Sequence, residues 1–258
     1  MVPEISIIIA AYNEEARLPA SLNRIHEYLA ARSINAEIIV VDDGSGDGTA
    51  AATLALAGSI PGLRLISYPV NRGKGYALRS GVLESKGPLV LLSDADLSTP
   101  IEELDSLITF IAEDSFHVAI GSRALALSRI EESQPWWRQG MGKIFNRIVK
   151  LLVIDDFSDT QCGFKLFVGD TARRLFNGAR INRFAYDVEI LALAKKNGYR
   201  IAEVPIKWIN SPGSKVDPVK DSLKMVRDLF RIRRSVGAVK MSRTPERSRR
   251  CAQADNGA

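Results

Sequence analysis

The sequence predicts an α/β fold, with a mostly parallel central sheet flanked by helices and with amphipathic helices towards the C-terminus. Up to about residue 121, short apolar runs alternate with segments of helical periodicity. Such alternation is typical of a parallel sheet with helices on both faces. Polar residues follow the first four apolar runs. Because ligands of such sheets bind beyond the carboxyl ends of the strands, these polar clusters predict one shared site.

The apolar runs are rich in Ile, Val or Leu, as expected for strands buried on both faces. Between the first two runs, Leu18, Leu22, Ile25 and Leu29 are spaced four, three and four apart, which is one face of a helix. The runs that we interpret as strands are Ile5–Ala11, Glu37–Val41, Leu63–Ser67, Leu89–Ser93 and Val118–Gly121.

The fourth run leads directly into Asp94-Ala95-Asp96. Strand side chains alternate between faces, so two aspartates separated by one residue would project to the same side. A divalent cation such as Mg²⁺ or Mn²⁺ would relieve the repulsion between them, because it takes carboxylate oxygens and completes its shell with phosphates and water. The alternative is a solvated loop in which both aspartates cap turns.

The other strand ends carry further polar groups. Tyr12 and Glu14 follow the first run, Asp42 and Asp43 the second, and the basic turn "NRGKG" at 71–75 the third. The glycines at 44–48 do not match a dinucleotide-binding fingerprint, and the basic turn lacks the spacing of a P-loop. A nicotinamide-dependent enzyme or an ATPase is therefore not favoured.

Two later segments predict basic amphipathic helices. The first spans residues 136–154, and the second begins at Asp217-Pro218, a good helix start. Each could pack its apolar stripe on the domain, or lie in a membrane interface with its cations near anionic lipid. The apolar stripes are Trp137, Met141, Ile144, Ile148 and Leu151 in the first helix and Val219, Leu223, Val226 and Phe230 in the second. The cations are Lys143, Arg147 and Lys150, and Lys220, Lys224, Arg227, Arg231 and Arg234.

Composition limits the class of protein. Residues 219–250 hold eleven Lys or Arg and three acids, whereas residues 1–218 sum to a charge of −2. Because no base-stacking aromatics interleave with the basic residues, anionic lipid is a better partner than nucleic acid. We expect no signal peptide and no membrane span. Cys162 and Cys251 match no metal-ligand spacing and Cys162 has no nearby His, which favours a reducing cytoplasm and a packed thiol at 162.

Four motifs in this order, "AAYNEE", "VVDDGSGDGT", "NRGKG" and "SDAD", resemble those of family 2 glycosyltransferases with a GT-A fold. The resemblance implies that Asp94 and Asp96 bind a Mg²⁺ or Mn²⁺ ion that holds the diphosphate of a nucleotide sugar. It also implies a nucleotide-sugar site formed by Ala10, Tyr12, Glu14, Asp42, Lys74, Asp94 and Ala95, with Asp42 on the nucleobase. Ala10 replaces a proline that is common in the family, which removes no contacting group because a proline offers only its carbonyl.

Later segments resemble the dolichyl-phosphate β-glucosyltransferases more than the dolichyl-phosphate mannose synthases. They are "DTQCGFKLF" at 159–167, "RFAYDVEILALA" at 183–194 and "WINSPGSKV" at 208–216. This resemblance implies UDP-glucose as donor and a polyprenyl phosphate as acceptor, at the cytoplasmic face of a membrane. We expect a GT-A domain over residues 1–217, a basic amphipathic helix over 218–241 and a disordered tail over 242–258.

A phosphate acceptor simplifies the expected chemistry. Its second pKa is about 6, so it is mostly dianionic at neutral pH and needs no strong base. The catalytic candidates are Arg123, Lys215 and Asp187, with Asp187 preferred to Glu189 as the acid that orients the acceptor. Arg123, Lys165 and Lys215 are candidates for holding the acceptor phosphate. Direct attack at the anomeric carbon would invert its configuration.

The sequence leaves two other functions open. The same machinery could use GDP-mannose or UDP-N-acetylglucosamine as donor, or a soluble sugar as acceptor. The chain could also be a non-catalytic module that binds nucleotide sugars or lipid, although the full set of polar strand ends argues for an enzyme.

Overall fold

The computed structural model describes residues 2–132, 136–211 and 218–237. A seven-stranded sheet has the order β3-β2-β1-β4-β7-β5-β8, and every neighbouring pair is parallel except those of β7 with β4 and β5. A two-stranded parallel sheet, β6-β9, lies beside it. The expected α/β class is thus confirmed.

The elements follow one another as strand and helix in the first half of the chain. They are β1 (Ile5–Ala11), α1 (Leu18–Ala31), β2 (Ala36–Asp42), α2 (Thr49–Leu56), β3 (Leu63–Ser67), α3 (Lys74–Leu83), β4 (Leu89–Asp94), the 3₁₀ turn η1 (Ile101–Glu103), α4 (Leu104–Asp114) and β5 (Val118–Ser122). All five expected strands are present within one residue at each end.

The second half adds the antiparallel strand and the remaining helices. They are β6 (Arg129–Glu132), α5 (Trp136–Leu152), β7 (Lys165–Val168), α6 (Gly169–Gly178), α7 (Tyr186–Lys196), β8 (Ile201–Pro205), β9 (Lys207–Ile209) and α8 (Pro218–Val236). The sequence did not predict β6, β7, β8 or β9, because strands of three to five residues carry little periodicity.

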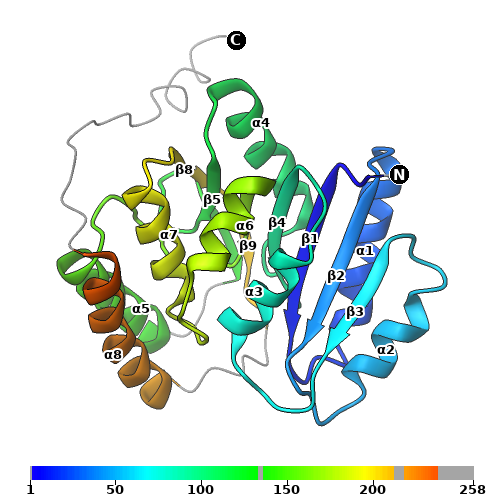
Figure 1. The fold of residues 1–258 in the computed structure, drawn as a ribbon, viewed down its shortest axis with the longest axis horizontal. Helices are drawn as coiled ribbons and strands as arrows, with labels where there is room; N and C mark the ends of the chain where they lie inside the picture. Colours follow the sequence, from blue (N-terminus) through cyan, green and yellow to red (C-terminus); the bar gives the residue numbers. More distant parts are fainter. Residues whose placement is uncertain (1, 133–135, 212–217, 238–258) are drawn as a thin grey trace.

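Two hydrophobic clusters lie on opposite faces of the sheet. Within β1, Ile8 belongs to the cluster under α3, α5, α6, α7 and α8, whereas Ile7 and Ile9 belong to the cluster under α1 and α4. All three isoleucines are fully buried, as expected for a strand covered on both faces. Figure 1 shows α3, α6 and α7 in front of the sheet, with α5 and α8 side by side at its edge.

Among the described side chains, helices α5 and α8 pack on the domain mainly through residues beside the predicted stripes, although Ile148 of the α5 stripe also packs against the core. Phe145 and Val149 of α5 and Leu229 and Ile232 of α8 are buried in the core. By contrast, Phe230 from the predicted α8 stripe is exposed. Of the two roles left open for the predicted stripes, packing on the domain is not the one that the exposed Ile144, Leu151 and Phe230 fulfil.

Helix α8 ends at Val236, and Gly237 has a φ of +80°, the left-handed conformation that commonly terminates helices. Residues 238–241 of the predicted segment 218–241 lie outside the described residues. Asp217 and the predicted tail at 242–258 lie outside the described residues. Within the described part of the chain, none of the helices combines the length and hydropathy needed to cross a bilayer.

Candidate active site

A cavity of about 400 Å³ opens at the carboxyl edge of the parallel strands. The ends of β1, β2 and β4 and the basic turn form one wall. The end of β5, the segments before β7 and before α7, and β9 with the segment after it form the other. Of the residues predicted from sequence, Ala10, Tyr12, Glu14, Lys74, Asp94, Ala95, Asp96 and Arg123 line this cavity. The structure therefore brings these predicted residues together at one cavity, and their roles stay predictions.

Asp94 and Asp96 lie next to each other at the end of β4 with their side chains partly exposed to the cavity. Asp94 accepts a hydrogen bond from the Lys74 ammonium, and Asp96 lies 3.3 Å from Nη1 of Arg17. Burial alone would raise the pKa of Asp94, but the neighbouring Lys74 charge outweighs burial and lowers it. Asp94 is therefore anionic at neutral pH.

These two carboxylates suit a hard divalent cation. Oxygen ligands are what Mg²⁺ and Mn²⁺ prefer, and the space beside Asp94 is kept open by Gly163, whose missing Cβ would overlap the carboxylate. Across the described residues, no group of three or more His, Cys, Asp or Glu side chains could hold a metal by itself. The donor set thus fits a metal that takes its remaining ligands from substrate phosphates and water.

The basic turn is held in place by Asp43, which the sequence analysis noted without giving it a role. Its buried carboxylate accepts hydrogen bonds from the backbone N–H of Arg72 at 2.7 Å and of Gly73 at 2.8 Å, and from Asn71 Nδ2 at 2.9 Å. Burial raises the pKa of Asp43. Gly73 has a φ of +101°, which favours glycine, and the turn delivers Lys74 to Asp94.

Asp42 faces away from this turn. Its carboxylate accepts hydrogen bonds from the Ser45 N–H and the Ser67 hydroxyl, both at 3.0 Å, and Asp42 does not line the cavity, whereas Asp43 does. The contact of Asp42 with a nucleobase stays a prediction.

Arg123 reaches the cavity from the end of β5 and is aligned by Asp159. Its Nε and Nη2 atoms donate to the two carboxylate oxygens at 2.6 and 3.0 Å. Asp159 is itself held in place, because the Glu203 carboxylate accepts hydrogen bonds from the backbone N–H groups of Ser158 and Asp159. Burial would lower the pKa of Arg123, but Asp159 raises it, so the guanidinium remains charged. Its central carbon lies 5.6 Å from the ring of Trp208, which also lines the cavity.

Lys165 and Asp187 form a buried ion pair behind the cavity. The Lys165 ammonium donates to Asp187 and to the carbonyl of Cys162, and both side chains are at least nine-tenths buried. Neither residue lines the cavity, so in this arrangement Lys165 cannot contact an acceptor without leaving Asp187. Burial raises the pKa of Asp187, and that of the packed Cys162 thiol to about 11. Lys215, the remaining cation predicted from sequence, lies outside the described residues.

Arg17 is a cavity residue that our sequence reasoning missed. Its guanidinium donates to both oxygens of Glu14 at 2.6 and 2.8 Å and also to Ser211 Oγ at 3.3 Å. Arg17 therefore connects the end of β1, the aspartate pair and the segment after β9. Its position three residues after Glu14 was visible, but its reach across to Asp96 depends on the fold.

Arg183 and Phe184 also line the cavity and were missed. They belong to the loop before α7, where the Glu189 carboxylate accepts the N–H groups of Arg180 and Ile181 at 2.8 to 3.0 Å. The carbonyls of Ile181 and Asn182 press against the basic turn, so a Cβ at Gly75 or Gly73 would lie only 2.5 Å from them. Glu189, which we had weighed against Asp187 as an acceptor-orienting acid, thus supports the turn that carries Lys74.

Comparison with known families decides the class of protein. A sequence model described as glycosyl transferase family 2 matches residues 6–168, which is more than half of the chain. The chain belongs to glycosyl transferase family 2. This assignment confirms the resemblance read from the four motifs, and the protein is a glycosyltransferase.

Curated relatives of this glycosyltransferase match most of the chain. The dolichyl-phosphate β-glucosyltransferase of Dictyostelium discoideum is 38% identical over 240 residues, covering 89% of this chain and 73% of the relative. The enzyme of the same name from Homo sapiens is 33% identical over 255 residues, covering 93% and 79%. The chain therefore spans nearly three quarters or more of the length of these relatives.

Solved structures confirm the GT-A fold of this glycosyltransferase. Glucosyl-3-phosphoglycerate synthase from Mycobacterium tuberculosis, bound to Mn²⁺, UDP and phosphoglyceric acid, has a TM-score of 0.68 at 18% identity, covering 93% of this chain and 80% of that one. A mannosyltransferase from Pyrobaculum calidifontis, bound to GDP-Man and Mn²⁺, has a TM-score of 0.58 at 20% identity and covers 88% and 61%. At these identities the likeness concerns the fold.

Proposed function

We propose that this glycosyltransferase transfers glucose from UDP-glucose to a polyprenyl phosphate of the dolichyl type, with inversion at the anomeric carbon. Its curated relatives at 33 to 38% identity are named for glucose transfer to dolichyl phosphate. A structural neighbour binds UDP with Mn²⁺, which supports a uridine nucleotide and a divalent cation here.

The observation that carries the proposal is that the carboxylates around the cavity are engaged in hydrogen bonds and ion pairs. Among the residues that the structure describes, each acid that lines the cavity is already bound: Glu14 by Arg17, Asp43 by the N–H groups of the basic turn, Asp94 by Lys74, and Asp96 by Arg17 and Ser98. None of these acids is placed as a free general base. A phosphate acceptor needs no base, because it is already anionic at neutral pH, whereas a sugar hydroxyl must lose a proton.

The residues suggest a mechanism of placement and charge neutralisation. A phosphate oxygen of the acceptor forms a bond to C1 of glucose from the face opposite UDP, while the bond from C1 to the diphosphate oxygen breaks and its electron pair leaves with UDP. Arg123, aligned by Asp159, would hold the acceptor phosphate, and Lys74 would neutralise the departing diphosphate. A Mg²⁺ or Mn²⁺ ion on Asp94 and Asp96 would supply further positive charge to the diphosphate.

The acceptor decides where this enzyme would work. A prenyl chain holds its phosphate in a bilayer, so we place the protein at a membrane surface, peripherally and on the cytoplasmic side, where nucleotide sugars are available. Nucleic acid has no role in this proposal.

The test is transfer of label from radiolabelled UDP-glucose to a polyprenyl phosphate in detergent, with Mg²⁺ or Mn²⁺, measured in the organic phase. We expect label in lipid with the parent protein, and a fall of at least 10²-fold with Asp96→Ala or EDTA. 3-Phosphoglycerate serves as a soluble phosphate acceptor for comparison. Label that enters only water-soluble products would disprove the lipid acceptor, and transfer only from GDP-mannose or UDP-N-acetylglucosamine would disprove the donor.

A further inference from the structure

Helices α5 and α8 expose apolar side chains on their outer surface although their inner faces are already packed. Ile144 and Leu151 of α5 are 56% and 82% exposed, and Phe230 of α8 is 51% exposed. The core contacts of these helices use Phe145, Val149 and the Leu229 side of α8, and the three exposed side chains are not part of the buried core.

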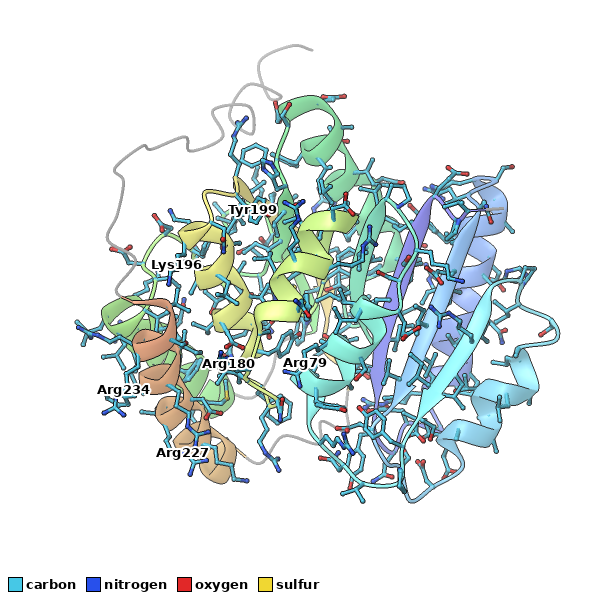
Figure 2. The ribbon with its side chains drawn as sticks, in the orientation of Figure 1. Arg79, Arg180, Lys196, Tyr199, Arg227 and Arg234 are labelled. Carbon is cyan, nitrogen blue, oxygen red and sulfur yellow. The ribbon has the colours of Figure 1, made fainter. Side chains whose placement is uncertain are left out.

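The same outer surface is strongly basic. On α5, which contains no Asp or Glu, Arg147 and Lys150 are exposed. On α8 the exposed cations are Lys224, Arg227, Arg231, Arg233 and Arg234, and Figure 2 shows Arg227 and Arg234 on the side of the helix away from α7. Between residues 224 and 236 the one acid is Asp228, which is buried and bound by Arg231. The exposed charge of this surface is therefore positive throughout its described part.

We propose that this surface of α5 and α8, defined by Ile144, Arg147, Leu151, Arg227, Phe230 and Arg234, docks on an anionic lipid bilayer. The proposal rests on the proposed function, because it identifies which face of the enzyme meets the membrane that carries the acceptor. Cations attract anionic headgroups, and the apolar side chains between them can enter the acyl boundary. A phosphodiester backbone offers no apolar surface to receive Ile144 and Leu151, so lipid fits better than nucleic acid.

The charge part of the proposal is tested by co-sedimentation with vesicles. The parent protein should bind phosphatidylcholine vesicles that contain phosphatidylglycerol, and should bind pure phosphatidylcholine weakly. Each cation near an anionic surface contributes roughly fivefold to the partition coefficient, so Arg227→Glu with Arg234→Glu should weaken binding at least about 25-fold. Lys86→Glu with Arg174→Glu is the matched control, since it makes the same charge change at two other exposed positions and should weaken binding less than fivefold.

The apolar part is tested by one further pair of variants. Leu151→Gln should reduce binding several-fold at high salt, where charge is screened, whereas Leu54→Gln on the exposed side of α2 should not. The docking surface would be overturned if the control pair Lys86→Glu with Arg174→Glu weakened vesicle binding as much as Arg227→Glu with Arg234→Glu does. Unchanged vesicle binding by Leu151→Gln would overturn it as well. Binding to a short oligonucleotide in place of vesicles would assign the surface to nucleic acid and would overturn it too.

These outcomes are separable from those of the transfer assay. Transfer to a polyprenyl phosphate dispersed in detergent should be unchanged in Arg227→Glu with Arg234→Glu, because neither residue lines the cavity. If this double variant transfers glucose normally in detergent and also binds vesicles as well as the parent does, the docking surface is refuted and the proposed function stands. Vesicle binding as expected without any transfer would refute the proposed function alone.

Discussion

Gly163 is a single residue on which the aspartate pair depends. A Cβ at this position would overlap the Asp94 carboxylate, so Gly163→Ala must displace a proposed metal ligand. A misplacement near 1 Å can cost about 10²-fold in rate, and we expect a loss of that order in kcat/KM with little change in Tm. Gly178→Ala is the control, because nothing lies within 4 Å of its Cβ position. Full activity of Gly163→Ala would show that Asp94 tolerates the shift.

The buried ion pair of Lys165 and Asp187 should contribute to the stability of the fold. Lys165→Met would leave Asp187 buried without its partner, and breaking such a pair commonly costs about 3–5 kcal/mol of the free energy of unfolding. Adding Asp187→Asn should recover part of that loss, because the uncompensated charge is removed. Urea unfolding of the two single variants and the double variant measures this coupling. Strictly additive losses would contradict it.

Acid should destabilise the protein partly through Asp159. Burial would raise its pKa, but Arg123 outweighs burial and lowers it below the value in the unfolded chain, about 3.9. A lowered folded pKa means that the stabilisation is present above about pH 4 and is lost as the pH falls towards the folded pKa. Asp159→Asn should therefore show a shallower decline of unfolding free energy between about pH 5 and pH 3 than the parent. Parallel curves from denaturant titrations would rule this out.

At the scale of elements, the loop at 180–184 supports the turn that carries Lys74. Glu189→Gln keeps one acceptor oxygen but turns an amide N–H₂ towards backbone N–H donors, so the loop should loosen. We expect faster hydrogen exchange at residues 71–76 and roughly a tenfold weaker affinity for UDP. Glu113→Gln, on the exposed side of α4, is the matched control. Loss of UDP affinity without any change in exchange would mean that Glu189 acts by another route.

The sequence predicted elements well where periodicity was long and poorly where it was short. The five strands of the first half were located because short stretches rich in Ile, Val or Leu alternate with helical segments, and the first four lead into polar clusters. Strand β7 has four residues and pairs antiparallel with β4 and β5, partners that are distant along the chain, so no local pattern marks it. For α5 and α8 the sequence left open whether the apolar stripe meets the core, and only the tertiary contacts show that Phe145 and Leu229 are buried while Phe230 stays exposed.

The sequence likewise predicted some residues of the cavity and missed others. Those directly after the first-half strands, such as Tyr12, Lys74 and Asp96, were found because topology brings strand ends together. Arg17 and Arg183 were missed because their approach to the cavity depends on side-chain reach and on a loop held by Glu189. Lys165 was expected at the acceptor, but its charge is matched by Asp187 behind the cavity wall, a pairing that spacing along the sequence does not reveal.

At the scale of the whole molecule, the proposed metal should bind for catalysis and not for folding. The fold rests on the two hydrophobic clusters, so EDTA alone should leave Tm unchanged. UDP with Mn²⁺ at about 100 times the dissociation constant should stabilise the protein by about 2.7 kcal/mol, or roughly 5–10 °C. Differential scanning fluorimetry measures this shift. Asp96→Ala should keep the parent Tm and lose the shift, and a large fall of Tm in EDTA would contradict the assignment.

The antiparallel strand β7 also has a consequence for the order of folding. Strands β3, β2, β1 and β4 can pair within the first 94 residues, but β4 meets its second neighbour only when residues 165–168 have been synthesised. Arg123, Gly163, Arg183 and Trp208, which form the far wall of the cavity, arrive later than the aspartates that they face. Because long-range pairing is slow, a nascent chain should display its acidic pair well before it can enclose a substrate. Catalytic competence would then be among the last properties to appear during refolding.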